Sequence, residues 1–375
     1  MYKLMTPGPT QVNDAVLAAR AIRFKNPDID ESFVEEYKQL CLKISRLLGT
    51  NNETFILGGE GILGLEAACA SLIEKGDRVL VIDNGIFGAG FADFVTMYGG
   101  EVTMYTTDYQ EAIDVEKFEK FLTENHDFKI ATVVHGDTPS GILNDVGSIT
   151  KVLKKYGILT IVDAVSTLFG EKLSLDYIDI LCGGSQKVIS APPGLTINIV
   201  SEAAKNAILN RKSPIASFYA NLKVFFNYYE EKWFPYTMPA SDINGLKAAI
   251  DYIEDDKAIY ERHSKIAEAT RKAVVKCGLN LFLRNGYSNT VTVFEVPEET
   301  TAEDIINTVK EDHDILITGS FGVFKGKVIR IGHMGNNANV EDMTKLMSAF
   351  DDAFKKLGVK LSGSLKEEFI NNYNA

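Results

Sequence analysis

Apolar and polar residues recur along the chain with different periods, and each period predicts a different element. Between Asp30 and Leu48 apolar residues return every three or four positions, and Gly49 stands where a helix ends, so a helix is expected there. Short apolar runs then alternate with helical patterns at residues 54–57, 78–82, 101–104, 129–134, 159–162, 178–181 and 195–200. Seven buried strands with helices between them predict an α/β fold whose mostly parallel sheet is covered on both faces.

The second half of the chain predicts a smaller α+β domain. We expect a long amphipathic helix over residues 244–277, strands near 290–296 and 327–331, and helices near 302–310 and 340–357. The predicted parts are an N-terminal arm over residues 1–16, a large domain over 17–257 and a small C-terminal domain over 258–375. Within the arm, the Pro/Gly segment 6–10 cannot form a helix and is expected to lie extended over another part of the protein. The polar tail after Gly358 is expected to be mobile.

Composition narrows the class of function. The 375 residues carry 39 Lys and Arg against 51 Asp and Glu, and the resulting net charge of −12 disfavours nucleic acid and membrane surfaces as partners. No signal peptide or membrane-spanning run is recognisable. Four scattered cysteines without a CxxC predict neither disulfides nor a thiolate metal site, and the five histidines lack metal-ligand spacing. These features favour a cytoplasmic globular protein without a metal centre.

A glycine-rich turn, residues 58–64 (GGEGILG), follows one predicted strand and opens a helix. Backbone amides at such a helix start bind anions, so the turn predicts a phosphate site. Gly59, Gly61 and Gly64 also match G-x-G-x-x-G, and Asp83 ends the next strand, as in a dinucleotide-binding fold. An NAD-dependent dehydrogenase is therefore a rival interpretation, and glycines that serve only tight packing are another.

Two further strand ends bear on the identity of the ligand. Asp163 follows the strand at 159–162, at the edge where α/β sheets bind ligands, although it would also serve as a helix N-cap. Lys187 leaves another buried strand in a turn of small residues, an unusual place for a surface charge. A phosphate site, an acid and a lysine together suit pyridoxal phosphate, because the lysine forms a Schiff base with its aldehyde and the acid keeps its ring nitrogen protonated. A dehydrogenase gives Asp163 and Lys187 no such joint role.

These residues resemble the class V pyridoxal-phosphate aminotransferases of fold type I, nearest the alanine/serine–glyoxylate (serine–pyruvate) aminotransferases. The resemblance covers nearly the whole chain. Its segments are 6–10 (TPGPT), the glycine turn, 84–88 (NGIFG), 135–141 (HGDTPSG), 162–166 (VDAVS), 184–187 (GSQK), 191–194 (APPG) and 328–332 (VIRIG). It implies the PLP-dependent transferase fold type I with a seven-stranded sheet, and a homodimer whose site is shared across the interface. The implied reaction moves an amino group from alanine or serine to glyoxylate or pyruvate.

The resemblance also assigns roles to single residues. Lys187 is implied as the catalytic Schiff-base lysine and Asp163 as the partner of the ring nitrogen. Further implied cofactor contacts are Gly61 and Ile62 at the phosphate, Phe87 on the ring face, Thr138 beside the ring oxygen, Gln186 near the phosphate, and Thr237 at the phosphate of the neighbouring subunit. Arg330 is implied to bind the substrate α-carboxylate, for which a two-pronged guanidinium is suited, and Gly8 and Glu60 are grouped with it at the substrate.

Two positions depart from the family pattern. Glu60 stands where relatives usually offer hydroxyl donors to the phosphate, and a carboxylate beside a phosphate dianion is unfavourable unless it turns away or meets a cation. Glu60 could instead face the substrate and contact an amine or amide. Phe234 stands where a tyrosine often reaches the phosphate across the dimer. These departures leave the cofactor affinity and the choice of substrate open.

Other functions stay open at this point. Within the family, a 2-aminoethylphosphonate–pyruvate aminotransferase is the alternative, with Arg20, Arg23 and Lys25 as candidate cations for the phosphonate. A cysteine desulfurase is disfavoured by Gln186 and Phe87, because that branch typically has histidines at both positions. Outside the family stand the dehydrogenase and a non-catalytic protein that binds the cofactor.

Overall fold

A seven-stranded sheet forms the centre of the larger part of the protein in the computed structural model, which describes residues 2–375. In order across the sheet, the strands are β2 (Glu53–Gly58), β10 (Leu195–Val200), β9 (Ile180–Gly184), β8 (Leu159–Asp163), β5 (Ile130–Val134), β3 (Arg78–Asp83) and β4 (Glu101–Thr106). Strand β10 runs antiparallel to both of its neighbours, and the other pairs are parallel. The mostly parallel α/β sheet expected from the sequence is thus confirmed.

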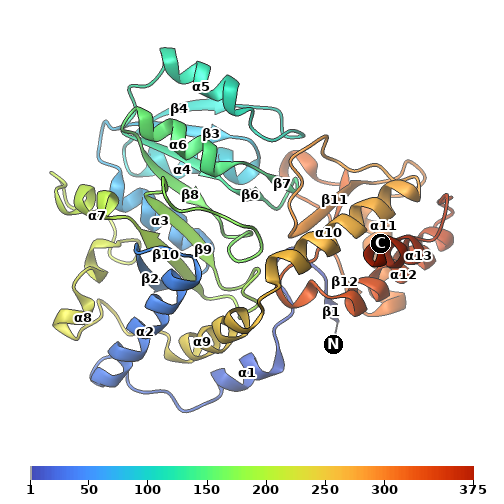
Figure 1. Ribbon diagram of the computed structural model, residues 1–375, viewed down its shortest axis with the longest axis horizontal. Coiled ribbons are helices and arrows are strands. Elements are labelled where there is room, and N and C mark those ends of the chain that lie inside the picture. Colours follow the sequence, from blue (N-terminus) through green and yellow to red (C-terminus); the bar gives the residue numbers. More distant parts are fainter. Residues whose placement is uncertain (1) are drawn as a thin grey trace.

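Helices pack around this sheet, and the C-terminal elements gather at one end of the molecule (Figure 1). The helices of the first part are α1 (Asp14–Arg20), α2 (Glu31–Leu47), α3 (Gly61–Leu72), α4 (Ile86–Met97), α5 (Val115–Glu124), α6 (Val146–Lys155), α7 (Glu202–Leu209), η1 (Lys223–Phe225), α8 (Tyr228–Glu231) and α9 (Ala240–Asp255), with the short strands β6 (Gly136–Asp137) and β7 (Ile142–Leu143). Helix α2 begins as the pattern predicts, because the Asp30 side chain accepts from the Ser32 amide and Phe33, Val34 and Tyr37 face the core.

The C-terminal part combines helices with two-stranded sheets. Its elements are α10 (Ile259–Lys276), β11 (Val291–Glu295), α11 (Ala302–His313), β12 (Ile315–Leu316), η2 (Gly322–Phe324), β13 (Val328–Gly332), η3 (Gly335–Asn337), α12 (Val340–Lys356) and α13 (Leu365–Asn374). Strands β11 and β13 are antiparallel, and β12 pairs in parallel with β1 (Lys3–Leu4) from the N-terminal arm.

Two sequence expectations for this part are wrong. The single helix over 244–277 is two helices, α9 and α10, because the Asp256 side chain accepts from the Ala258 amide and from Arg262 and so favours a turn. The polar tail after Gly358, expected to be mobile, forms a packed helix: Ser364 caps α13 by accepting from the Glu367 amide, and Leu365 and Phe369 are buried. The apolar pair at i and i+4 after a Ser-x-x-Glu sequence was the signal for this helix.

The buried apolar side chains form two main clusters. The larger runs from Val16 to Ile259 and includes Met334, while the second joins Met5 to residues between Ile266 and Phe369. The N-terminal arm therefore packs with the C-terminal part of the chain. The division into residues 17–257 and 258–375 stays a prediction.

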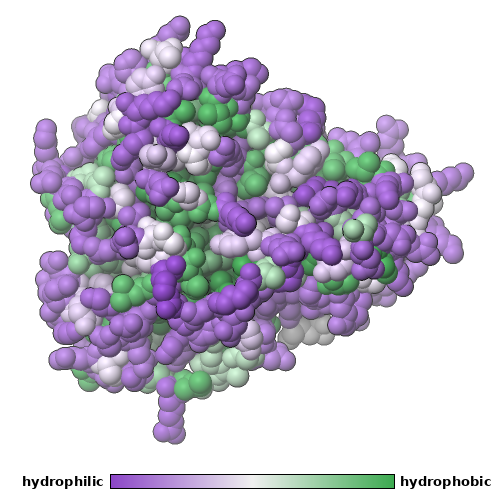
Figure 2. Space-filling view, in the orientation of Figure 1, coloured by the Kyte–Doolittle hydropathy of each residue, from purple (hydrophilic) through white to green (hydrophobic). Residues whose placement is uncertain are grey.

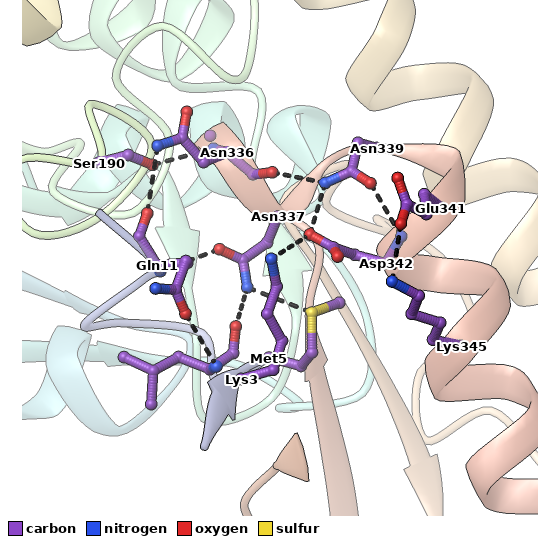
Figure 3. A network of polar contacts seen from close by, with 12 residues as sticks. Lys3, Met5, Gln11, Ser190, Asn336, Asn337, Asn339, Glu341, Asp342 and Lys345 are labelled. Atoms are coloured by element: carbon purple, nitrogen blue, oxygen red, sulfur yellow. Dashed lines mark hydrogen bonds and ion pairs between the residues drawn. The ribbon is translucent and has the colours of Figure 1, made fainter. Parts of the chain in front are cut away.

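A polar network fixes the arm to the rest of the protein (Figure 3). Asn337 accepts from the Gln11 amide at 3.0 Å and donates to the Leu4 carbonyl. The Ser190 hydroxyl accepts from the Asn336 amide at 2.9 Å and lies 3.1 Å from the Thr10 hydroxyl. The network thus joins the arm, the turn after β9 and the segment after β13, and it holds residues 6–10 in place between them.

The surface is largely polar. Figure 2 shows hydrophilic residues over most of the outline of this face, with hydrophobic residues gathered nearer its middle. Within residues 2–375, no helix combines the length and the apolar composition needed to cross a membrane. Cys41, Cys69, Cys182 and Cys277 are all buried and unpaired.

Candidate active site

Three chain segments converge at the carboxyl edge of the sheet. Strand β8 ends at Asp163, and the adjacent β9 ends at Gly184 and leads into Lys187. A Cβ atom on Gly184 would lie 3.2 Å from Val165 Cγ1 and 3.5 Å from Gly61 Cα. These close approaches leave little room for a side chain at Gly184, so the ends of β8 and β9 and the start of α3 come together.

Lys187 is half-buried at this meeting point. Its Nζ donates a 2.7 Å hydrogen bond to the Pro7 carbonyl, and a Cβ on Gly8 would lie 2.3 Å from its Cδ and 2.5 Å from its Nζ. Burial lowers the pKa of Lys187 to about 8, and the positive charge of Arg330 adds to this, while Asp163 and Glu60 oppose it. An amine with such a pKa exchanges a proton near neutral pH, as an acid–base group must.

Asp163 shares this environment. Its Oδ1 accepts from the Val165 amide at 2.8 Å. Burial raises the pKa of Asp163 to about 7, with Asp137 and Glu60 adding to the rise and the Val165 amide and Lys187 opposing it. Asp163 and Lys187 therefore act on each other electrostatically, and Asp163 offers a buried carboxylate suited to a protonated ring nitrogen.

Arg330, on β13, is 8% exposed and has no anionic partner at ion-pair distance within residues 2–375. Its Nε donates to the Gly319 carbonyl at 2.6 Å and its Nη1 to the Thr138 carbonyl at 3.4 Å. The guanidinium also lies 5.6 Å from the centre of the Phe321 ring. Burial lowers the pKa of Arg330 to about 10, and Asp137 opposes this change. A buried cation held only by carbonyl groups is a strong site for an incoming carboxylate.

Asp137 also belongs to the site. It lies in the segment 135–141 named above, but the sequence alone assigned it no role. Its Oδ1 accepts from the Phe87 amide at 3.0 Å, and its Oδ2 accepts from the Ser140 hydroxyl at 2.8 Å. Burial raises the pKa of Asp137, and Arg330 opposes the rise. Asp137 thereby fixes the start of α4, where the Phe87 ring packs edge-on against Phe321 at 6.1 Å. The signal was available, because Asp137 follows the buried strand β5 at the same edge of the sheet as Asp163.

The glycine turn differs from the simple anion site that its glycines suggest. Helix α3 begins at Gly61 rather than near Leu65, and Glu60 is its N-cap. Glu60 Oε1 accepts from the Ile62 amide at 3.2 Å, and Oε2 accepts from Gln186 Nε2 at 2.9 Å. Gln186 is 6% exposed, and its Oε1 has no hydrogen-bond partner. The Ile62 amide, assigned to phosphate by the resemblance, is thus engaged by a carboxylate of the chain itself.

Thr237 and Phe234 lie in the loop before α9. The Thr237 hydroxyl is exposed and donates to Asp28 Oδ2 at 2.9 Å. Phe234 packs against Phe33, Tyr37 and Tyr228 with ring centres 4.9–5.7 Å apart, so it serves the core of this subunit. Contact of Thr237 with a neighbouring subunit stays a prediction.

Several residues named by the alternative interpretations have structural partners. Asp83 accepts from the Tyr109 hydroxyl at 2.6 Å and from Thr106 at 3.1 Å. Arg20 pairs with Asp242, and Lys25 with Glu36 at 2.7 Å. Two of the three candidate phosphonate cations are thus already neutralised.

The two histidines nearest the site motifs are also satisfied within the fold. His135 contacts the Thr167 hydroxyl at 2.8 Å, and His333 contacts the Thr292 hydroxyl at 2.8 Å. Burial lowers the pKa of His135 to about 4 and that of His333 to about 3, so both rings are neutral at pH 7.

Comparisons with known proteins show which family and which folds the chain is similar to. Residues 7–346 match the family described as aminotransferase class-V. The chain is 32% identical over 368 residues to a pyridoxamine–pyruvate transaminase of Mesorhizobium japonicum, covering 95% of this chain and 93% of the relative. It is 30% identical over 365 residues to an alanine–glyoxylate aminotransferase of Callithrix jacchus, covering 94% and 87%. The crystal structure of a ureidoglycine–glyoxylate aminotransferase from Bacillus subtilis superposes with a TM-score of 0.96 at 26% identity, covering 100% of this chain and 98% of the other.

Proposed function

The chain belongs to the class V aminotransferases, and we propose that it moves an amino group from alanine or serine to glyoxylate or pyruvate. Enzymes of this family act on small amino acids and 2-oxo acids. The observation that carries the proposal is that a half-buried Lys187 amine with a lowered pKa and a buried Arg330 guanidinium without an anionic partner occur in the same site. Glyoxylate and pyruvate are the acceptors in the names of the similar proteins, which supports them here.

The family is pyridoxal-phosphate dependent, so this cofactor is implied by membership. The chemistry of the ring end suits it: we propose that Lys187 would meet the aldehyde, Asp163 the ring nitrogen and Phe87 the ring face, with Thr138, whose carbonyl accepts from Arg330, near the ring oxygen. When bound, the ring supplies an electron sink that makes the Cα proton of an amino acid acidic. The phosphate end fits poorly, because Glu60 brings a carboxylate to the start of α3.

We assign the other roles in the reaction to residues of the chain. Arg330 binds the substrate α-carboxylate through its free N–H groups and so orients the Cα–H bond. Lys187 Nζ, neutral in part near pH 8, would take the proton from the substrate Cα and deliver it to the carbon of the cofactor's aldehyde group. Asp163 would hold a protonated ring nitrogen by its negative charge, which that cation would in turn favour. Asp137 positions Phe87 through the Phe87 amide and supplies negative charge near Arg330.

The proposal includes a homodimer in the cytoplasm with Thr237 at the site of the neighbouring subunit. The exposed position of Thr237 and the exposed aromatic residues Phe218, Tyr219 and Trp233 nearby in sequence support an interface there. Light scattering at several protein concentrations tests the dimer. Mixing inactive Lys187→Ala with Thr237→Ala protein tests the sharing, since exchanged dimers would regain one complete site.

A panel of amino donors tests the substrates. Alanine, serine, aspartate and 2-aminoethylphosphonate are each offered with glyoxylate and with pyruvate, and the new amino acid is quantified by chromatography. We expect turnover with alanine or serine. Turnover confined to 2-aminoethylphosphonate would contradict the proposal, although the pairing of Arg20 and Lys25 with carboxylates argues against a phosphonate.

A further inference from the structure

We propose that the end of the site formed by Glu60, Gln186 and the start of α3 receives a hydroxymethyl group rather than a phosphate ester. The protein then binds an unphosphorylated pyridoxal or pyridoxamine ring at least as tightly as its 5′-phosphate. This inference rests on the proposed function for the placement of the ring between Lys187 and Asp163, and it concerns only the substituent at the opposite end of the ring.

Glu60 takes up the hydrogen-bonding position that an anion would use. As N-cap of α3, its Oε1 accepts from the Ile62 amide at 3.2 Å, and its Oε2 accepts from Gln186 at 2.9 Å. A carboxylate at a helix N-terminus is stabilised by the same amides and dipole that would stabilise a phosphate. The negative charge that this helix start favours is therefore already supplied by the chain.

No cation of the described chain lies at ion-pair distance from Glu60, although its charge acts on that of Lys187 at longer range. Within residues 2–375, no ion pair includes Glu60, and the nearby Lys187 Nζ donates instead to the Pro7 carbonyl. A phosphate dianion at this place would face an uncompensated carboxylate, and like charges at close range repel. A neutral substituent avoids this repulsion.

Gln186 adds a second reason, independent of charge. Its side chain is 94% buried, its Nε2 is committed to Glu60, and its Oε1 has no partner. An orphaned buried acceptor costs free energy that a ligand can recover only by donating a hydrogen bond. A phosphate dianion has no proton to donate, whereas a hydroxymethyl group donates one.

The donors that a phosphate needs are scarce at this end. The side chains of Glu60 and Ile62 supply no N–H or O–H, and Phe234 packs in the core of its own subunit. Among the described residues the Gly61 amide is not engaged by another group of the chain, but one amide is a small share of what a phosphate requires. Acceptors thus dominate this end of the site, which matches an alcohol.

The test compares two rings that differ only in the phosphate ester. Pyridoxamine and pyridoxamine 5′-phosphate are titrated by calorimetry into protein freed of bound ring, so that no covalent bond to Lys187 contributes and no turnover is needed. The variants are Glu60→Ser, which keeps an N-cap residue and adds a hydroxyl donor, and Glu60→Gln, which removes only the charge. Glu66→Gln is the matched control, because it removes a carboxylate from the same helix at a position bonded to Tyr98. Circular dichroism verifies that each variant is folded.

We expect the wild type and Glu66→Gln to bind pyridoxamine with a Kd equal to or below that of the phosphate. Glu60→Ser should shift the ratio of the two Kd values toward the phosphate by at least about tenfold, since one unit of like charge has been removed. Wild-type protein that prefers pyridoxamine 5′-phosphate, with a ratio unchanged in Glu60→Ser and Glu60→Gln, would overturn the inference and leave the proposed function standing. If the wild type bound neither ring, the proposed function would fail, and the inference with it.

Discussion

Gly8 gives the sharpest prediction about how the N-terminal arm shapes the site. Its φ is +101°, and an added Cβ would lie 2.3, 2.5 and 2.6 Å from Cδ, Nζ and Cε of Lys187. Gly8→Ala therefore forces either the arm or the lysine to move. Real Cβ atoms do not approach other heavy atoms this closely, and because all three atoms belong to the end of one flexible side chain, we expect the lysine to be the part that moves.

The expected magnitude has two parts. Alanine at a positive φ costs about 1–2 kcal/mol of folding free energy wherever it occurs. The overlap with Lys187 adds little to this cost, because the end of a flexible side chain can move away, and its effect falls on activity instead. Displacing Nζ from the Pro7 carbonyl also moves the proton-transferring atom, and a displacement of about 1 Å lowers kcat/KM by roughly a hundredfold.

Gly76→Ala is the matched control, because Gly76 has a φ of +84° but nothing within 4 Å of its added Cβ. Urea unfolding followed by circular dichroism and steady-state aminotransferase kinetics are measured on both variants. We expect both variants to lose a similar amount of stability, and Gly8→Ala alone to lose activity. If both variants kept wild-type kcat/KM, the contact between the arm and Lys187 would not exist in the working enzyme.

Three further predictions follow from individual contacts of the site. Arg330→Lys should raise the KM for amino acids by about 10–100-fold, since a charged hydrogen bond is worth roughly 1.5–3 kcal/mol, while an amine donor without a carboxylate should be unaffected in steady-state assays. Asp137→Ala should lower the free energy of unfolding by about 1–3 kcal/mol, because the Phe87 amide and the Ser140 hydroxyl lose their acceptor; a urea midpoint equal to that of the wild type would contradict this. Lys187→Met should be more stable than the wild type at pH 7, because burial lowers the pKa of Lys187 to about 8 and penalises its charged form in the fold. That penalty is complete below pH 8 and disappears as the pH rises toward the unfolded value near 10.5, so the advantage in urea unfolding should shrink between pH 8 and 10.5, and an advantage constant with pH would refute the burial argument.

The sheet was predictable because its strands are short, apolar and separated by helical periods. All seven expected runs correspond to strands, although the run at 178–181 begins two residues before β9. The break between α9 and α10 was not predictable from periodicity, since the apolar spacing continues across it and the side chain of Asp256 ends the helix locally. Helix α13 was not predicted, because the polar composition after Gly358 indicated a mobile tail. The Ser-x-x-Glu capping pattern at its start is only four residues long.

The sequence predicted those site residues that have a chemically informative side chain and that follow the end of a buried strand. Lys187 and Asp163 follow strands β9 and β8, and the parallel order of these strands brings both residues to the same edge. The position of Asp137 after strand β5 indicated a site residue, but its role was not predictable, because that role lies in contacts with Phe87 and Ser140 that no sequence pattern reveals. The conflict between Glu60 and a phosphate was visible in the sequence. Its outcome was not, because it depends on the Glu60 side chain turning onto the Ile62 amide and Gln186.

Covalent attachment at position 187 tests the account most directly. The protein is incubated with pyridoxal and, separately, with pyridoxal phosphate, reduced with borohydride, digested and analysed by mass spectrometry. The account predicts a reduced pyridoxyl group on the peptide that contains Lys187, and neither labelling nor transamination in Lys187→Ala. A label carried by a different lysine, or transamination retained by Lys187→Ala, would contradict it.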